Sequence, residues 1–217
     1  MRHFSAICIT TFDSTTISQI YQAIINWYMG AVGHRAEIRE LGTSLIAATV
    51  AVYQTSMQTL LPTPQKSHYT FNLRDFSRII QGITLLRPYE GLTKESMIRL
   101  WLHESSRVIM DRLQDEEDKD WFLENIGKIA EEEFGLGLDD LIGQLHPAGS
   151  GKGDMSCHRR LFFGNFKREA PAEDEEASYE ELSEVEELVP LIEGKLENYN
   201  VEMKNQMDLV IFVFAVE

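Results

Sequence analysis

Apolar residues recur every three or four positions along most of the chain between residues 13 and 135, and this spacing constrains the fold more than any other feature. Asp13 or Ser14 can cap the first helix, and Gly30 and Gly33 close it. Its apolar positions are Ile17, Ile20, Tyr21, Ile24, Ile25 and Tyr28. Their helical spacing predicts a helix over this segment.

Further helices are predicted along the same stretch. One runs from Ala36 to Leu61, where two prolines stop it. The next begins at Asn72, a good capping residue, and carries Phe76, Ile79 and Ile80. Another begins at Thr93 and continues through the acidic stretch DEEDKD into WFLENIGKIAEEEFG, which predicts a helical hairpin.

The opening HFSAICIT is short and rich in β-branched and aromatic residues, and it ends at a polar cluster, so it predicts one strand. Beyond Gly135 the composition shifts to glycine, proline and basic residues. The acidic run REAPAEDEEASYEELSEVEELVP then predicts a solvated linker, and helical periodicity returns from Tyr179 to Glu217. The fold class is therefore expected to be mainly α with one N-terminal strand.

Composition excludes several classes of function. With 43% hydrophobic residues the chain belongs to the globular class, and a net charge of -15 disfavours contact with nucleic acid or an anionic membrane. No apolar run approaches the roughly 20 residues that span a bilayer. Cys8 and Cys157 are too few for a disulfide framework. These features predict a soluble, intracellular protein.

The stretch PAGSGKGD, which ends at Asp154, superficially suggests a phosphate-binding loop. The P-loop pattern requires a glycine where the chain has His146, and a serine or threonine where it has Gly153. The preceding glycines and proline also lack the buried strand that leads into a P-loop. We therefore predict a flexible connecting loop, with Lys152 facing solvent.

Neither a metal site nor a self-contained catalytic site is predicted. The sequence HESSR resembles the start of a zinc-protease motif, but Arg107 stands where the second histidine ligand is needed, so a surface salt bridge is expected instead. Neither cysteine lies in a nucleophile motif, and there is no GxSxG elbow. No recognised ligand spacing joins the other candidate metal ligands, His146, Cys157 and His158.

Arg74 is unusual in its position. It falls in the first turn of the helix that begins at Asn72, where a cation opposes the helix dipole at a cost of a few tenths of a kcal/mol. An anionic group nearby would offset that cost, so the sequence predicts an anionic partner for Arg74. The alternative is a structural salt bridge with Asp75 or with an acid on the next helix, and Arg78, one turn on, is expected to be structural.

The stretch LLPTPQKSHYTFNLRDFSRIIQG closely resembles the dynein heavy chains, in the small helical subdomain, or lid, of their third AAA+ module. RLWLHESSRVIMDRLQDEEDKDWF resembles the long lid helices that follow. LFFGNF, LENYN and MDLVIFVFA resemble the entrance to the fourth module. The stretch SHYTFNLRDFSR is more similar to axonemal heavy chains than to cytoplasmic ones. The resemblance covers almost the whole chain.

This resemblance implies a division of the chain. Residues 1–12 would be the last strand of the third module's large subdomain, and residues 13–135 its helical lid. Residues 136–178 would be a partly flexible linker, and residues 179–217 the truncated N-terminal helices of the fourth module. The parent protein would be an ATP-driven, microtubule-based motor in the axoneme of cilia or flagella, a part of the cytoskeleton within the cytoplasm.

The resemblance also implies two functional arginines. Arg74 matches the sensor II arginine, which reaches the phosphates of nucleotide bound by the same module, and Arg2 matches an arginine finger presented to a neighbouring module's nucleotide. ATP or ADP with magnesium would be the cofactor of the parent motor. The family's P-loop and Walker B segment would lie outside this chain, so it is expected to bind no nucleotide tightly and to have no ATPase activity alone.

The implied partners are the neighbouring AAA+ modules of the same heavy chain, with intermediate chains, light chains and microtubules bound by other parts of the parent. No nucleic acid and no membrane is expected. Two other classes of function remain as alternatives. One is an acidic helical module that binds proteins without nucleotide, and the other is a complete small hydrolase.

Overall fold

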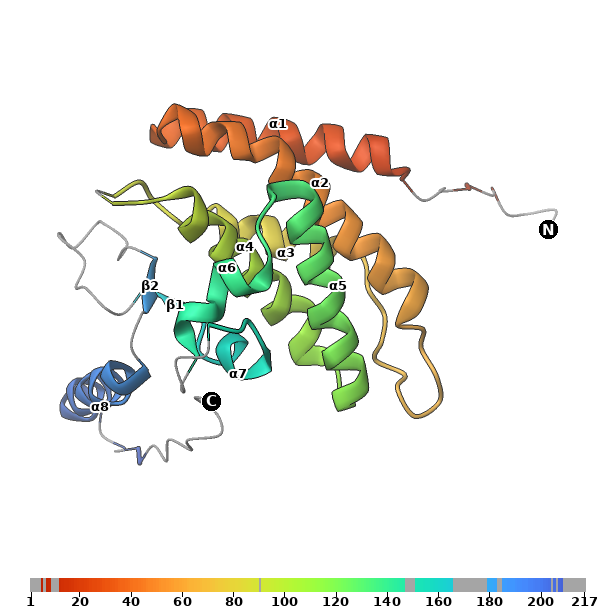
Figure 1. Cartoon of the computed structure of the whole chain (residues 1–217). Coiled ribbons are helices and arrows are strands. Elements are labelled where there is room, and N and C mark those ends of the chain that lie inside the picture. Colours follow the sequence, from red (N-terminus) through yellow and green to blue (C-terminus); the bar gives the residue numbers. More distant parts are fainter. Residues whose placement is uncertain are drawn as a thin grey trace.

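The structure is a computed structural model, and it describes residues 5, 7–8, 12–89, 91–146, 151–165, 179–182, 185–203, 205 and 207–208. Helices dominate this part of the chain, and its only sheet has two short strands (Figure 1). The mainly α fold class is thereby confirmed. None of the described helices combines the length and the apolar composition needed to cross a membrane.

Two long helices open the fold. Helix α1, Ser14–Val32, is capped by Asp13, whose carboxylate accepts a hydrogen bond from the Thr16 amide at 3.2 Å. It ends at Gly33, which has a φ of 83° and therefore occupies the left-handed region that favours glycine. Helix α2, Ala36–Thr59, packs against α1, so both predicted helices are confirmed.

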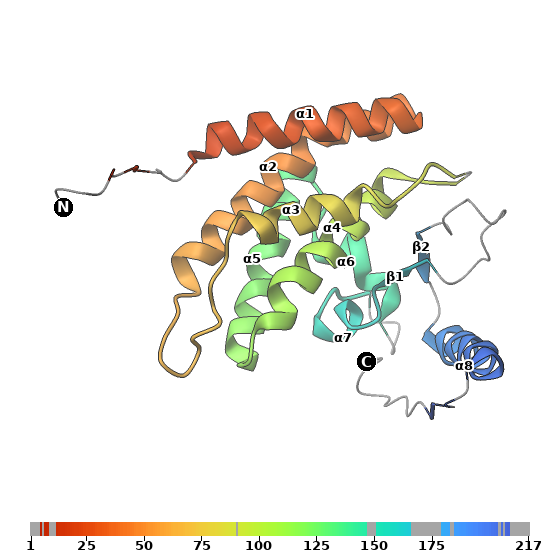
Figure 2. The same ribbon diagram turned by 180° about the vertical axis from the view of Figure 1, so that it is seen from behind.

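Only part of the predicted apolar stripe of α1 is buried. Ile17, Ile25 and Met29 are buried, but Ile20 and Ile24 are exposed, and Trp27 is 71% exposed. Figures 1 and 2 show why, because α1 lies along one side of the helical body and only one of its faces meets other helices. The predicted helix is confirmed, but the helical spacing did not show that Ile20 and Ile24 would be exposed.

Three further helices build the body around α2. They are α3, Leu73–Ile83, α4, Lys94–Ile109, and α5, Glu116–Phe134. The predicted caps are confirmed, since the side chains of Asn72 and Thr93 accept backbone hydrogen bonds at the starts of α3 and α4. The short 3-10 turn η1, Met110–Arg112, lies between α4 and α5, and both of these helices pack against α2.

A single main core runs through these helices. Trp101, from α4, is fully buried, and its indole nitrogen donates to the Thr49 hydroxyl at 3.0 Å. Its ring meets that of Phe134 edge-on, with centroids 5.2 Å apart. Burying each large apolar side chain of this kind contributes about 2 kcal/mol, so packing on α2 stabilises helices that are marginal alone.

Much of the segment beyond Gly135 is folded as well. It contains α6, Leu138–Ile142, the 3-10 turn η2, Gly143–Leu145, α7, Met155–His158, and strand β1, Phe162–Gly164. Helix α6 packs against α4 and α5, and β1 also contacts α4. These parts of the predicted 136–178 linker therefore belong to the helical body, because their apolar residues Leu141, Ile142 and Leu161 join its core.

Strand β2, Glu180–Leu182, pairs antiparallel with β1, with Phe162 opposite Leu182 and Gly164 opposite Glu180. Helix α8, Val185–Glu202, follows, as the returning periodicity predicted. Leu188 of α8 packs with Leu182 in a small apolar cluster separate from the main core. Figure 2 shows this helix at the edge of the molecule, beyond the strand pair.

The predicted N-terminal strand lies mostly outside the described residues. Those of its residues that are described, Ser5, Ile7 and Cys8, belong to no strand and are exposed. Arg2, the candidate arginine finger, also lies outside the described part.

Candidate functional site

The first turn of α3 holds Arg74 on a fixed backbone. The Asn72 side chain accepts a hydrogen bond from the Arg74 amide at 2.8 Å, and the Asp75 carboxylate accepts one from the Asn72 amide at 3.0 Å. Asn72 and Asp75 form a capping box, in which each side chain accepts from the other residue's backbone amide, and this satisfies backbone donors that a helix start otherwise leaves open. The Arg74 side chain is exposed and makes no ion pair with any residue in the described part of the chain.

Asp75 is paired with a different arginine. Arg112 of η1 donates from Nη2 to Asp75 Oδ1 at 2.6 Å and from Nη1 to Oδ2 at 3.2 Å. Burial alone would raise the pKa of Asp75, but the hydrogen bonds from Arg112 and from the Asn72 amide outweigh it and hold that pKa below its ordinary value. The alternative in which Asp75 pairs with Arg74 is therefore wrong, because Arg112 occupies the carboxylate.

The loop that leads into α3 is fastened at several points. Lys66 Nζ lies 2.6 Å from an oxygen of Asp115 and 2.5 Å from one of Asp118, and these contacts raise the pKa of Lys66. The Tyr69 hydroxyl donates to Asp118 at 2.9 Å. Arg112 also donates to the Thr70 carbonyl at 2.9 Å. The start of α3 is therefore tied to η1 and to the first turn of α5.

This arrangement suits recognition of an anion. Asp75 and Arg112 neutralise each other, so Arg74 is left as an exposed cation beside the backbone amides of a helix N-terminus. Its planar, permanently charged guanidinium can bind two phosphate oxygens at once. The predicted position of Arg74 in the first turn is confirmed.

The stretch PAGSGKGD contributes to packing in its described part. The Gly153 amide donates to Asp139 Oδ1 at 2.6 Å, and a Cβ atom at Gly153 would collide with the Leu138 carbonyl. The Lys152 carbonyl accepts a hydrogen bond from the Cys157 thiol at 2.9 Å. These contacts fasten residues 151–153 to α6 and α7 as connecting chain; residues 147–150 lie outside the description.

Glu104, in the HESSR stretch, is fully buried, which corrects the expectation of a surface salt bridge. Arg107 donates to Glu104 Oε2 from Nη2 at 2.6 Å, and the Tyr179 hydroxyl donates to Oε1 at 2.7 Å. Gly82 of α3 allows this burial, because a Cβ atom there would collide with the carboxylate. The glycine inside a helical pattern was the only sequence signal for this close approach.

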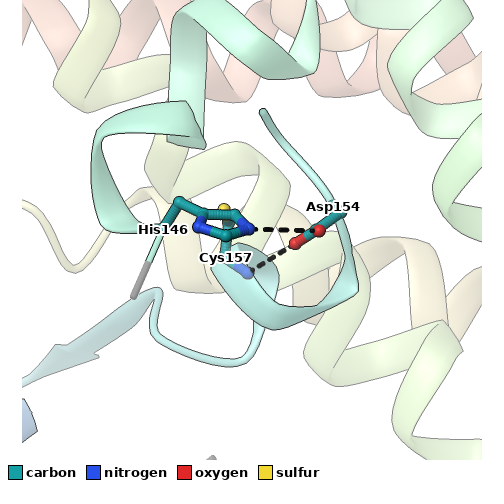
Figure 3. A group of neighbouring side chains, drawn as sticks. All are labelled: His146, Asp154 and Cys157. Atoms are coloured by element: carbon teal, nitrogen blue, oxygen red, sulfur yellow. Dashed lines mark hydrogen bonds and ion pairs between the residues drawn. The ribbon is translucent and has the colours of Figure 1, made fainter. Parts of the chain in front are cut away.

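The structure also gathers three side chains whose sequence spacing fits no metal motif. His146, Asp154 and Cys157 place one potential ligand atom each within 4.8 Å of one another (Figure 3). Asp154 is the third member of this group, and His158, a candidate ligand from the sequence, is not part of it. The His158 ring is buried, and its nitrogens have no hydrogen-bond partner among the described residues.

Comparison with known protein families matches residues 45–146 to the AAA+ lid domain. Over 217 residues the chain is 37% identical to dynein axonemal heavy chain 3 of Homo sapiens and 34% identical to dynein axonemal heavy chain 12 of Rattus norvegicus. It is also 31% identical over 226 residues to dynein axonemal heavy chain 1 of Homo sapiens.

These similarities confirm the resemblance to axonemal dynein heavy chains over the whole chain. The chain spans 5% of the length of the first of these relatives and 7% of the second. The range matched to the AAA+ lid domain contains α3 and α4, so both Arg74 and the buried Glu104 lie inside it.

Proposed function

We propose that this chain acts as the nucleotide-sensing lid of the third AAA+ module in a microtubule-based, ATP-driven motor of cilia or flagella, and that Arg74 is its sensor. The observation that carries the proposal is the exposed Arg74 guanidinium on a braced helix start inside an AAA+ lid domain. ATP or ADP with magnesium would occupy the site between this lid and a large subdomain outside the chain. Arg74 would then contact its phosphates.

Transmission of the nucleotide state would run through α3 and α4. Gly82, near the end of α3, lies against Glu104 of α4, and Glu104 accepts a hydrogen bond from Tyr179, just before β2. Arg99 of α4 also donates to both carboxylate oxygens of Glu181, at 2.7 and 2.8 Å. A rotation of the lid would therefore carry residues 179–182 with it, and α8 follows directly.

The proposed partners follow from this position in a ring. Neighbouring AAA+ modules of the same heavy chain would contact the lid directly, and the exposed apolar face of α1 would be covered by one of them. Intermediate chains, light chains and microtubules would bind other parts of the motor. The proposed location is the axoneme, and Arg2 is proposed as an arginine finger toward a neighbouring module.

The test is Arg74→Ala in the full heavy chain, with Arg78→Ala, one turn along the same helix, as the matched control. We expect Arg74→Ala to weaken nucleotide retention in the third module and to change microtubule gliding velocity, since a charge-assisted contact to phosphate is lost. Retention is measured by release of a fluorescent nucleotide in a background where the other modules cannot bind it. Unchanged retention would contradict the role assigned to Arg74.

A second measurement concerns the 217-residue chain alone. We expect no ATP hydrolysis above a contaminant control, because the magnesium-binding and water-positioning groups would be supplied from outside this chain. Hydrolysis that persists in Arg74→Ala would overturn both the proposed role and the proposed site.

A further inference from the structure

Three side chains near the end of the lid domain converge on one point. His146 follows η2, Asp154 caps α7 and Cys157 lies within α7. His146 Nε2 lies 3.5 Å from Asp154 Oδ2, and one ligand atom from each of the three residues lies within 4.8 Å of the others. Figure 3 shows the imidazole and the carboxylate turned toward each other beside the cysteine.

Local contacts hold these groups in place. Asp154 Oδ1 accepts hydrogen bonds from the Ser156 and Cys157 amides at 3.0 and 3.2 Å, which leaves Oδ2 directed toward His146. Gly143 and Gly151 let the two chain segments approach, because a Cβ atom at Gly143 would collide with the Gly151 carbonyl. Gly151 also has a φ of 70°, which favours glycine. Backbone hydrogen bonds and close backbone packing therefore hold the three side chains near one another.

The donor set is an imidazole nitrogen, a thiol sulfur and a carboxylate oxygen, which suits zinc better than the oxygen-seeking ions calcium and magnesium. Tetrahedral zinc with bonds of about 2.0 to 2.3 Å places its ligand atoms roughly 3.3 to 3.8 Å apart. The separation of 3.5 Å between His146 and Asp154 already meets this requirement. The cysteine sulfur lies within 4.8 Å of the other two ligand atoms and would move closer to them on binding.

We propose that His146 Nε2, Asp154 Oδ2 and Cys157 Sγ bind one zinc ion, with water as the fourth ligand. Solvent can reach the ion because His146 and Asp154 are only partly buried, although Cys157 is fully buried. On binding, the Cys157 thiol releases its proton to solvent, the sulfur–metal bond forms, and the thiol hydrogen bond to the Lys152 carbonyl is lost. No oxidation state changes.

The bound ion would join the end of η2 to α7 and so fasten the connection between the lid and β1. The site does not depend on Arg74 or on nucleotide, because it involves none of the residues at the start of α3. A catalytic cysteine is not the better interpretation, since Cys157 is fully buried and a substrate could not reach its sulfur.

The experiment titrates Co²⁺ into the purified, reduced 217-residue chain and records its absorption spectrum. We expect one equivalent to produce a thiolate-to-cobalt charge-transfer band together with the d–d bands of four-coordinate cobalt, and Zn²⁺ to displace it. Cys157→Ser should remove the charge-transfer band, whereas Cys8→Ser should retain it. Cys8 is the matched control because it is exposed and distant in sequence.

Two further variants test the other ligands. His146→Ala and Asp154→Asn should each weaken cobalt affinity by more than about tenfold, since losing a ligand costs at least as much as losing an outer-shell partner. Asparagine keeps the helix cap of α7, and His68→Ala, which alters a histidine hydrogen-bonded to the Arg112 carbonyl, serves as the control. Circular dichroism checks that each variant is folded.

The proposal is overturned if the parent chain shows no charge-transfer band, if the band survives Cys157→Ser, or if Zn²⁺ does not displace cobalt. Should Cys157→Ser fail to fold, the parent spectrum and the Asp154→Asn affinity decide the matter. An unchanged affinity in Asp154→Asn then rejects the site.

Discussion

The start of α3 and the middle of α4 both carry an arginine next to or near an acidic residue. In α4 the two side chains form an ion pair, whereas in α3 they do not. In α4, Glu104 is fully buried and is satisfied by Arg107 and by Tyr179. In α3, Asp75 is satisfied by Arg112, and Arg74 remains exposed with no ion pair in the described part of the chain. The paired charges around Glu104 hold elements of the fold together. The exposed guanidinium of Arg74, on a rigid backbone, is available to bind a ligand.

The largest loss of stability should come from removing the arginine that pairs with the buried Glu104. Arg107→Ala leaves the Glu104 carboxylate buried with the hydrogen bond from the Tyr179 hydroxyl and with His103 Nε2 3.9 Å away. Removing one partner of a buried pair costs about 3 to 5 kcal/mol. The Arg107 side chain is 51% exposed, so we expect a loss near the lower limit, about 3 kcal/mol. Urea unfolding measures it, with Lys128→Ala as a surface control. A loss below about 1 kcal/mol would contradict this account.

The second effect concerns the Asp75–Arg112 pair. Asp75→Asn should lower the free energy of unfolding at neutral pH by about 2 kcal/mol, because hydrogen bonds between charged groups are lost. The pKa of Asp75 is lower in the folded state than its ordinary value of 3.8. The ionised Asp75 carboxylate therefore contributes its full stabilisation to the free energy of unfolding above pH 3.8. This stabilisation is lost as the pH falls through the lower pKa of the folded state.

Urea unfolding from neutral to acid pH checks this contribution. The difference between the parent and Asp75→Asn should shrink as the pH falls below 3.8. Asp120→Asn, at an exposed position on α5, should leave the parent profile unchanged. A difference that stays constant across the acid range would show that the charge of Asp75 is not the cause.

The third effect tests the brace beneath Arg74. Asn72→Ala removes the side chain that accepts the Arg74 amide hydrogen bond, and loss of such a cap costs about 1 kcal/mol. Asn72→Asp keeps an acceptor there and should cost much less. Thermal unfolding of both variants measures the difference. Equal losses in the two would mean that the cap does not stabilise α3.

The smallest change in stability should come from removing the exposed Arg74 side chain itself. Arg74→Ala should change the stability of the isolated chain by less than about 0.5 kcal/mol, because the side chain is exposed and unpaired in the described part. Removing its conflict with the helix dipole can even stabilise α3 by a few tenths of a kcal/mol. Urea unfolding checks this result. A large loss would show that Arg74 is structural.

Local features were the most predictable part of the fold. The caps at Asn72 and Thr93 were predicted, and Asp13 was one of two candidates for the first cap, because a cap bonds amides only two or three positions away. The place of Arg74 in the first turn of α3 followed from the same rule. The exposure of Ile20 and Ile24 on α1 was missed, because periodicity marks an apolar face without showing how much of it other helices cover.

The sequence by itself determined helices α1 to α4 and the place of Arg74 in the first turn of α3, since these depend on residues within a turn of each other. Tertiary structure decided that Glu104 is buried, because that depends on Gly82 and on Tyr179 far along the chain. It also brought His146, Asp154 and Cys157 together through a loop closure that their spacing does not show. Contacts between distant segments depend on how the helices pack, so a local pattern of residues in the sequence does not predict them.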